Sequence, residues 1–399
     1  MKNYLKKISA ISWLNGKIKS LLLKNNLKRI SNHFYSKAKS QNYKYNKLEA
    51  VNEFKKRLFS RNSNFKKKEI GELKVLWIGA NESQDFSGFI QGMKRICDLV
   101  EFKNSHSSYG IWYGDENSTT EEIRMSNDQD LINQLAYELD NNGIDVVMGQ
   151  MWANYISNES LEWARKKGIL IINVSMDDRL PEHWGIKRGI NLGAIGLSSS
   201  TDMVLTTSSE TCGWYGVNGC PAIYWPLASD PEVFKSRKEA VRDIDVLFIG
   251  NKYGYRTKVI KGLKKAGINV SCYGKGWDNG PVMSKEMALL FKRAKIMLGI
   301  GTIGHCEDVY TLKLRDFDAP MSGALYITHR NPDLLQMFEE GKDIECYETI
   351  NEASTKIKFY LNNPENLKKI ADNGSKLATK RDTWDKRLTD TFQIIGLIK

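Results

Sequence analysis

Apolar residues in this chain gather into short continuous runs, and stretches with helical periodicity separate these runs. The first set of apolar runs occupies residues 74–79, 144–149, 168–174, 202–207 and 221–226. The helical stretches between them lie near residues 86–98, 128–142, 157–167 and 209–216. Continuous apolar strands joined by crossover helices are typical of a parallel sheet with both faces covered. The pattern therefore predicts one α/β domain over residues 71–228.

Prolines between Pro226 and Pro231 interrupt this alternation, which predicts a domain boundary. The second set of apolar runs occupies residues 243–250, 268–274, 295–300 and 324–328. Helical stretches lie near residues 256–266, 284–293 and 311–322, from Pro332 onward, and over most of 349–399. We expect a second parallel-sheet domain over residues 229–380, with both domains Rossmann-like and doubly wound. Ligands bind beyond the carboxyl ends of such strands, so the cleft between the domains is the expected site.

Residues 1–70 follow a different pattern. At about 100° per residue, one set of apolar positions falls in a sector roughly 140° wide, opposite a sector of lysines. These apolar positions are Tyr4, Ile8, Ile11, Leu14, Ile18, Leu21 and Leu22. The pattern predicts a basic amphipathic helix, followed over residues 31–70 by a polar linker with a short helix near 47–58.

Such a helix has more than one use. It can lie in the headgroup region of an anionic membrane through residues 1–30, with Trp13 as an interfacial anchor. Its apolar stripe can instead pack on the protein's own body or on a second copy, or the segment can stay disordered.

The charge distribution narrows the choice of partners. The 399-residue chain has a net charge of +12. Residues 1–70 contain 19 basic and three acidic side chains, which leaves 40 basic and 44 acidic side chains elsewhere. Because the body of the protein is mildly acidic, the chain-wide charge does not indicate nucleic-acid binding, and we expect no nucleic-acid partner.

Cysteine spacing and hydropathy indicate a cytoplasmic protein. The six cysteines contain no C-x-x-C pair, which favours reduced, buried thiols over a zinc site or a disulfide framework. No segment reaches the roughly 18–20 apolar residues of a membrane span, and the N-terminus lacks a signal-peptide pattern. A peripheral position at the inner face of the cell membrane remains compatible with the basic helix. The sequence also shows no Walker loop, nucleophile elbow or metal-ligand cluster.

The first candidate binding segment follows the strand predicted at 243–250. The strand ends at Gly250, a turn with Asn251 and Tyr253 follows, and a helix starts near Arg256. Free backbone N–H groups at a helix start favour a phosphate, and a guanidinium adds a bidentate contact. The alternative is an ordinary glycine turn after a strand.

Two further candidates lie in the same predicted domain. Gly274 ends another strand, and nearby Trp277 can either stack on a nucleobase or cover the domain edge. Read as one helix, residues 311–322 place Arg315 and Asp318 on one face. That pair can bind a diphosphate and ribose hydroxyls, although its spacing alone favours a surface ion pair.

The N-terminal domain offers two carboxylates at strand ends. Asp85 lies in the loop after the first strand, and Asp178 follows the strand at 168–174. Either can act as a general base or hold an acceptor. Asp178 can equally pair with Arg179 or cap a turn.

Five segments in this order resemble the CgeB-like bacterial glycosyltransferases, whose C-terminal half is of the "glycosyl transferases group 1" type. The segments are residues 84–91, 245–256, 268–280, 313–328 and 381–387. The resemblance runs from about Leu73 to Leu388 and leaves out the basic helix.

The resemblance implies a GT-B fold, a nucleotide-diphosphate sugar as donor, and no required cofactor or metal. It implies that Lys313 and Arg315 contact the diphosphate, with Gly250 and Arg256 nearby. Asp318 stands where the family usually has a glutamate for the ribose, and it is one methylene shorter. The final helix, 381–399, would cross back to the N-terminal domain, which would select a glycan or lipid-linked acceptor.

Three functions remain open at this point. The first is a glycosyltransferase building a cell-surface polysaccharide or glycoconjugate. The second is a GT-B-fold nucleotide-sugar epimerase, which needs no acceptor. The third is a non-catalytic GT-B scaffold, against which the presence of Lys313, Arg315 and Asp318 weighs.

Overall fold

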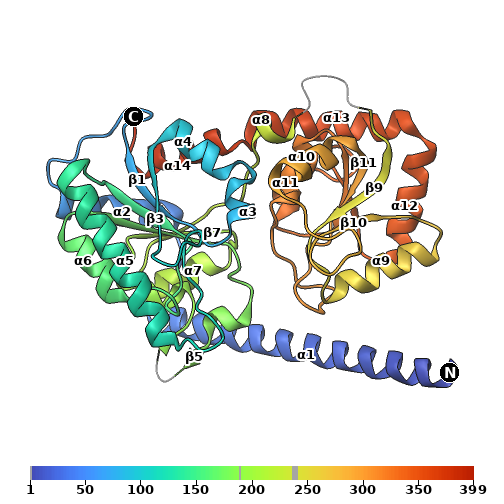
Figure 1. Ribbon diagram of the computed structural model, residues 1–399, viewed down its shortest axis with the longest axis horizontal. Helices are drawn as coiled ribbons and strands as arrows, with labels where there is room; N and C mark the ends of the chain where they lie inside the picture. The colour runs from blue at the N-terminus through green and yellow to red at the C-terminus, as the bar shows by residue number, and fades with distance from the viewer. Residues whose placement is uncertain (1, 188–189, 236–240) are drawn as a thin grey trace. The chain divides into compact units, whose positions relative to one another are not determined.

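The computed structural model describes residues 2–187, 190–235 and 241–399, in two compact units (Figure 1). Unit 1 comprises Met1–Arg29 and Leu227–Thr383, and unit 2 comprises Ile30–Pro226 and Trp384–Lys399. Each unit has a parallel sheet with helices on its faces. The expected architecture of two parallel-sheet α/β domains is therefore confirmed.

The sheet of unit 2 has six parallel strands in the order β2-β1-β3-β4-β7-β8. Its strands are β1 (Lys74–Ile78), β2 (Asp98–Glu101), β3 (Val146–Gly149), β4 (Leu170–Ser175), β7 (Met203–Thr206) and β8 (Ala222–Tyr224). All six residues of β4 are buried, as the continuous apolar run predicted. The two short strands β5 (Ile186–Lys187) and β6 (Ile190–Asn191) form a separate antiparallel pair.

Helices cover this sheet and connect its strands. They are α3 (Glu82–Gln84), the π-helical turn η1 (Asp85–Phe89), α4 (Ile90–Ile96), α5 (Thr120–Asn141), α6 (Asn158–Lys166) and α7 (Thr211–Val217), with 3-10 turns η2 (Pro181–Trp184) and η3 (Ala194–Leu197). Thr119 and Glu122 form a capping box that starts α5. The last helix, α14 (Trp384–Ile395), also belongs to unit 2, where Trp384 packs against Phe89 and Trp225.

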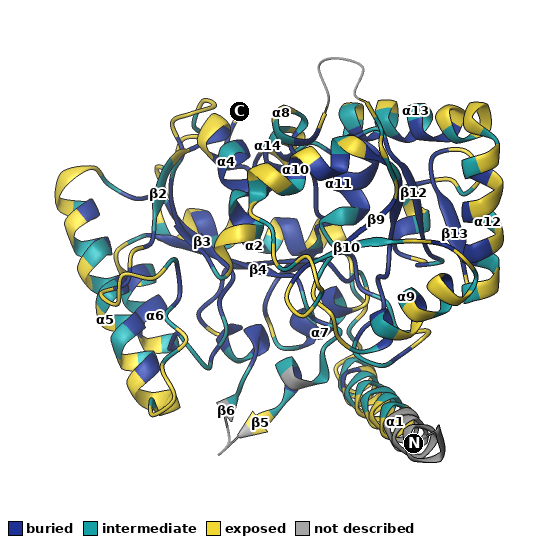
Figure 2. Cartoon of the chain, turned by 45° about the vertical axis from the view of Figure 1, so that its right-hand side comes forward, coloured by how far each residue is buried: buried dark blue, intermediate teal, exposed yellow. Residues whose placement is uncertain are grey.

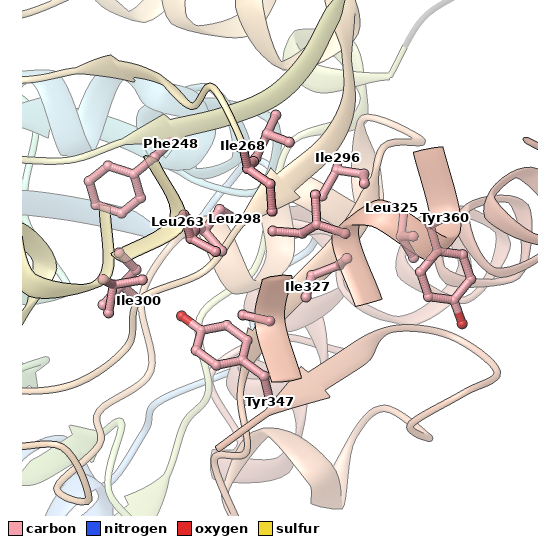
Figure 3. Packing of buried hydrophobic residues seen from close by; sticks show 14 of the residues in the cluster. Phe248, Leu263, Ile268, Ile296, Leu298, Ile300, Leu325, Ile327, Tyr347 and Tyr360 are labelled. Atoms are coloured by element: carbon pink, nitrogen blue, oxygen red, sulfur yellow. The ribbon is translucent and has the colours of Figure 1, made fainter. Parts of the chain in front are cut away.

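The sheet of unit 1 has five parallel strands in the order β10-β9-β11-β12-β13. Its strands are β9 (Ile244–Ile249), β10 (Ser271–Tyr273), β11 (Ala294–Leu298), β12 (Leu325–His329) and β13 (Glu345–Tyr347). The helices of this unit are α8 (Pro231–Phe234), α9 (Tyr255–Lys265), α10 (Ser284–Arg293), α11 (Arg315–Met321), α12 (Ile350–Asn362) and α13 (Pro364–Arg381). Buried side chains such as Phe248, Leu298 and Ile327 form its core (Figure 3).

Two predicted helices of unit 1 differ from the structure. The helix expected over 311–322 begins only at Arg315, because Thr311 is paired in extended backbone with Gly301. The helix expected from Pro332 is absent. The Asn331 side chain accepts a bond from the Asp333 N–H and turns the chain, so only the 3-10 turn η4 (Leu334–Gln336) forms before β13.

The segment expected as a linker is instead packed. Helix α1 spans Lys2–Ser40 and α2 spans Lys47–Arg61, with Asn46 as the α2 N-cap. Val51, Phe54 and Leu58 bury one face of α2 in unit 2. The α2 helix itself was predicted from the sequence, but its buried face was not.

The predicted apolar stripe of α1 is described only in part. Ile18, Leu21 and Leu22 are exposed. Figure 2 shows exposed and half-buried positions alternating along the described part of α1. The side chains of Tyr4, Ile8, Ile11, Trp13 and Leu14 lie outside the described residues. No helix among the described residues has the length and apolar character needed to span a membrane. All six cysteines are buried, and the structure records them as free thiols.

Candidate functional site

Two glycine turns meet at the carboxyl edge of the unit 1 sheet, one after β9 and one after β10. Gly274 has a φ of +129°, and a Cβ atom there would lie 2.6 Å from the carbonyl carbon of Gly250. The Gly250 N–H donates to the Tyr273 carbonyl at 2.8 Å. The Asn251 side chain accepts a bond from the Lys275 N–H at 3.1 Å. Only glycine permits this close approach, so both turns are held as one surface.

Trp277 fixes this surface from one side. Its indole Nε1–H donates to the Gly250 carbonyl at 2.8 Å, and its ring packs edge-on against Phe248. The Lys252 ammonium lies 5.1 Å from the ring centroid. The tryptophan therefore packs on the Gly250 turn, and its side chain remains half-buried.

Two guanidinium groups converge on Gly250. A Cβ atom on this glycine would lie 2.6 Å from Nη2 of Arg315 and 3.2 Å from Nη1 of Arg256. Arg315 comes from the start of α11, and its Nε donates to the Ile249 carbonyl at 3.1 Å. Arg256 comes from the start of α9, and its Nη1 donates to the Asn251 carbonyl at 2.9 Å.

Arg256 is the more enclosed of these two cations, and the charge nearest to it is the positive charge of Arg315. Arg256 is only 5% exposed, and its Nε atom has no hydrogen-bond partner. Burial, and then the neighbouring charge of Arg315, lower the pKa of Arg256 to about 10, so it stays charged at neutral pH. Tyr253 stacks on Arg256, with the guanidinium carbon 4.2 Å from the ring centroid. A buried Arg256 guanidinium with the half-buried Arg315 guanidinium beside it favours an anionic ligand.

The acidic residues of α11 are enclosed. Asp316 accepts the Lys313 N–H at 2.7 Å and the Tyr326 hydroxyl, and burial raises its pKa. Asp318 is also buried, and loss of solvent raises its pKa well above the usual range. The charge of Arg315 offsets part of the rise in the Asp318 pKa, and Asp318 is buried rather than at the surface.

Asp85 lies at the carboxyl edge of the unit 2 sheet, just beyond β1. Its Oδ2 accepts bonds from the Trp77 indole at 3.1 Å and the Tyr109 hydroxyl at 2.9 Å. Its Oδ1 accepts a bond from the Gln150 amide at 3.2 Å. Burial raises the pKa of Asp85 to about 6, and the bonds from Tyr109 and Trp77 offset part of that rise.

A tight loop positions Tyr109 on this carboxylate. The Asn104 amide donates to the carbonyls of Ser108 and Gly110 at 2.9 and 2.6 Å, which fixes the turn between them. A Cβ atom on Gly79 would lie 2.4 Å from the Tyr109 ring, so the strand end and the ring are in direct contact. No motif or spacing in the chain points to Tyr109. Gln150, which directly follows β3, could have been found from its place at a strand end.

Asp178 has a different environment. Its two oxygens accept bonds from four hydroxyls, those of Ser175, Thr206, Thr211 and Tyr215. The residue is buried, and burial raises its pKa. Four donors use the acceptor capacity of a carboxylate, so the arrangement ties β4, β7 and α7 together. The predicted pairing with Arg179 is not what satisfies this side chain.

No group of three or more histidine, cysteine, aspartate or glutamate side chains that could hold a metal ion occurs within the described residues.

Comparisons with known proteins match the C-terminal part of the chain to a family and the whole fold to solved structures. Residues 256–393 match a family described as "Glycosyl transferase-like". A search of curated proteins gives no match. The matched residues include α9 with Arg256 and α11 with Arg315.

Solved structures of the same fold cover most of the chain. Sucrose-phosphate synthase from Thermosynechococcus elongatus is 9% identical with a TM-score of 0.56, covering 80% of this chain and 98% of that one. HepE from Anabaena, in complex with UDP-glucose, is 9% identical with a TM-score of 0.55, covering 81% and 100%. A glycosyltransferase from Rickettsia africae is 9% identical with a TM-score of 0.56, covering 82% and 98%. The expected GT-B fold is confirmed, and the family match supports the expected glycosyltransferase class.

Proposed function

We propose that this chain is a glycosyltransferase that moves a sugar from a nucleotide-diphosphate sugar to a glycan or lipid-linked acceptor. The finer assignment is to the CgeB-like group, in the synthesis of a cell-surface polysaccharide or glycoconjugate. One observation carries the proposal: the guanidiniums of Arg256 and Arg315 converge on the Gly250 turn, at the sheet edge where such folds bind ligands.

The chemistry of the leaving group explains why two cations are needed. When the glycosidic bond to the donor phosphate breaks, negative charge builds on the departing nucleoside diphosphate. Preorganised cations in a site with little water stabilise such developing charge strongly. Arg256 and Arg315 are preorganised by their bonds to the carbonyls of Asn251 and Ile249. Lys313, whose backbone is held by Asp316, would add a third cation. The proposal requires no metal or other cofactor.

The surroundings of the other residues at the proposed nucleotide-sugar site suggest what each of them would do. Gly250, Asn251 and Gly274 keep the backbone low enough for phosphate oxygens to approach. Tyr253 supports Arg256, and the half-buried face of Trp277 is available to a base or sugar. The ribose contact expected of Asp318 stays a prediction, and its burial favours a supporting role beneath Arg315. HepE of Anabaena, a structure of the same fold, holds UDP-glucose, which supports a donor of this class.

On the acceptor side we propose Asp85 as the general base. A carboxylate with a pKa of about 6 is mostly ionised at neutral pH, yet it is basic enough to accept a proton from an attacking hydroxyl. Asp178 would act at a distance, by holding β4, β7 and α7 in place. We also propose that the enzyme works at the inner face of the cell membrane, where residues 1–30 would contact anionic lipid.

The direct test is replacement of Arg315 by alanine. We expect Arg315→Ala to fold normally and to lower donor turnover by about 10²–10³-fold, the usual cost of removing one donor that stabilises transition-state charge. Release of nucleoside diphosphate in the presence of acceptor is the measurement.

Arg293→Ala is the matched control, because Arg293 is a half-exposed arginine of the same unit that pairs with Asp243. Normal turnover by folded Arg315→Ala would refute the assignment. Conversion of the donor to an epimer without acceptor would instead establish the epimerase.

A further inference from the structure

Helix α1 presents two opposite faces between residues 15 and 30. Its half-buried positions recur at helical spacing and share one side of the helix, as Gly16, Ser20, Leu23 and Leu27 illustrate. On the other side Ile18, Leu21 and Leu22 are 46%, 59% and 58% exposed. These three residues, here called the outer stripe, lie within about one turn of each other on that side of the helix.

The inner face of α1 is already occupied by unit 1 itself. The Ser20 hydroxyl lies 3.4 Å from the Cys306 sulfur, and Lys24 pairs with Asp308 at 2.7 Å. A Cβ atom on Gly16 would lie 3.3 Å from the His305 ring. The helix is therefore seated through its inner face, and this leaves the outer stripe pointing away from the surface that holds it.

The charges beside the outer stripe are positive. Lys17 and Lys28 flank it on one side and Lys19 flanks it on the other, at 100° per residue. No acidic residue precedes Glu49 in the chain. Apolar side chains between lysines are the pattern of a helix that lies in the headgroup region of an anionic membrane. A neutral protein surface would offer these lysines no opposite charge, whereas anionic lipid headgroups would.

The residues that hold α1 lie at the carboxyl edge of the unit 1 sheet, here called the donor edge because the donor site is proposed there. Residues 302–310 follow β11, and they form a hairpin in which the Ile303 N–H donates to the Val309 carbonyl. The carbonyl of Gly304, in the same hairpin, accepts the N–H of Tyr255 at 2.8 Å. Tyr255 directly precedes Arg256. One hairpin thus contacts both α1 and the start of α9.

From this arrangement we infer that the outer stripe of α1 docks unit 1 onto an anionic lipid surface and holds the donor edge of its sheet there. The docking stands on the helix alone. Its consequence, that the acceptor is lipid-linked rather than a free glycan, rests on the proposed function.

Vesicle flotation tests the inference with the full chain. The probes are vesicles of phosphatidylcholine alone, and of two parts phosphatidylcholine to one part phosphatidylglycerol. We expect the wild-type protein to float with the anionic vesicles only, and to be released by high salt. The double variant Leu21→Asp with Leu22→Asp should lose binding by about tenfold or more, since it places charge where apolar contact is needed.

Leu48→Asp is the matched control, because Leu48 is an exposed leucine of α2, 67% accessible, outside the outer stripe. It should float like the wild type. Equal flotation of the double variant and the wild type, or no flotation of the wild type, would overturn the inference. The inference would also be overturned if light scattering showed that the wild type and Leu48→Asp are dimers and that the double variant is a monomer. Nucleoside diphosphate binding, measured by calorimetry, should be the same in the wild type, the double variant and Leu48→Asp. If flotation fails while this binding persists, the membrane inference is overturned and the proposed function is not.

Discussion

Arg256 illustrates at the scale of one residue how position creates a candidate site. In the sequence it is an arginine near the start of a predicted helix, compatible with an ordinary surface side chain. In the structure it is buried beside a second arginine, and its Nε atom has no partner. Because the two arginines are far apart in sequence, no spacing rule could have predicted that both reach Gly250. Their strand-end positions were predictable, and their convergence was not.

Asp85 allows a prediction at the same scale. If its carboxylate is the base, turnover should rise with pH as the group ionises near its pKa of about 6. The Tyr109 hydroxyl bond lowers that pKa, so Tyr109→Phe should raise it and move the acidic limb of the rate profile to higher pH. One hydrogen bond to a charged group corresponds to about one pH unit. At pH values well above this acidic limb, the turnover rate of Tyr109→Phe should stay within a few-fold of the wild-type rate.

Tyr113→Phe is the control for this prediction, because the Tyr113 hydroxyl donates to the Ala80 carbonyl and not to Asp85. Its profile should match that of the wild type. The role of Asp85 would be refuted by superimposable profiles for Tyr109→Phe and wild type, together with normal turnover in Asp85→Asn.

At the scale of elements, the predictable parts were those with a strong local pattern. The strands predicted from continuous apolar runs all form, and α13 begins at Pro364, as Asn363 followed by proline indicates. The edge strand β2 was missed because its four residues are exposed or half-buried. Strand β13 was missed because Asp343 and Glu345 interrupt its apolar residues, so no continuous apolar run marks it. Residues 31–70 were predicted as a polar linker with a short helix, but α1 continues to Ser40 and α2 packs a buried face into unit 2. Tertiary packing of this kind leaves no local pattern in a polar segment.

The packing of α2 yields a stability prediction. Phe54 is fully buried in unit 2, so Phe54→Ala should lower the free energy of unfolding by about 3–5 kcal/mol. Phe59 lies on the same helix and is 50% exposed, and Phe59→Ala should change it by less than about 0.5 kcal/mol. Chemical denaturation of both variants is the measurement. Equal effects would mean that α2 does not contribute a buried face.

At the scale of the whole molecule, each of the two parallel sheets carries its own candidate residues at its carboxyl edge. Unit 1 offers cations for a diphosphate, and unit 2 offers a partly buried carboxylate for a hydroxyl proton. The two-sheet architecture followed from the alternation of apolar and helical stretches. The positions of the candidate residues could be predicted from the strand ends, because ligands of such sheets bind there. The identity of the sugar, the base and the acceptor depends on side-chain contacts that no pattern in the chain specifies.

Calorimetric titration of the full chain with a panel of nucleoside diphosphates tests the central claim most directly. We expect at least one of them to bind while the matching nucleoside without phosphates does not. Arg256→Gln and Arg315→Ala should each weaken that binding by about tenfold or more, as loss of a charge-assisted contact implies, while Arg293→Ala leaves it unchanged. If the folded chain binds none of the panel, or if both variants bind as tightly as the wild type, the donor site proposed here is contradicted.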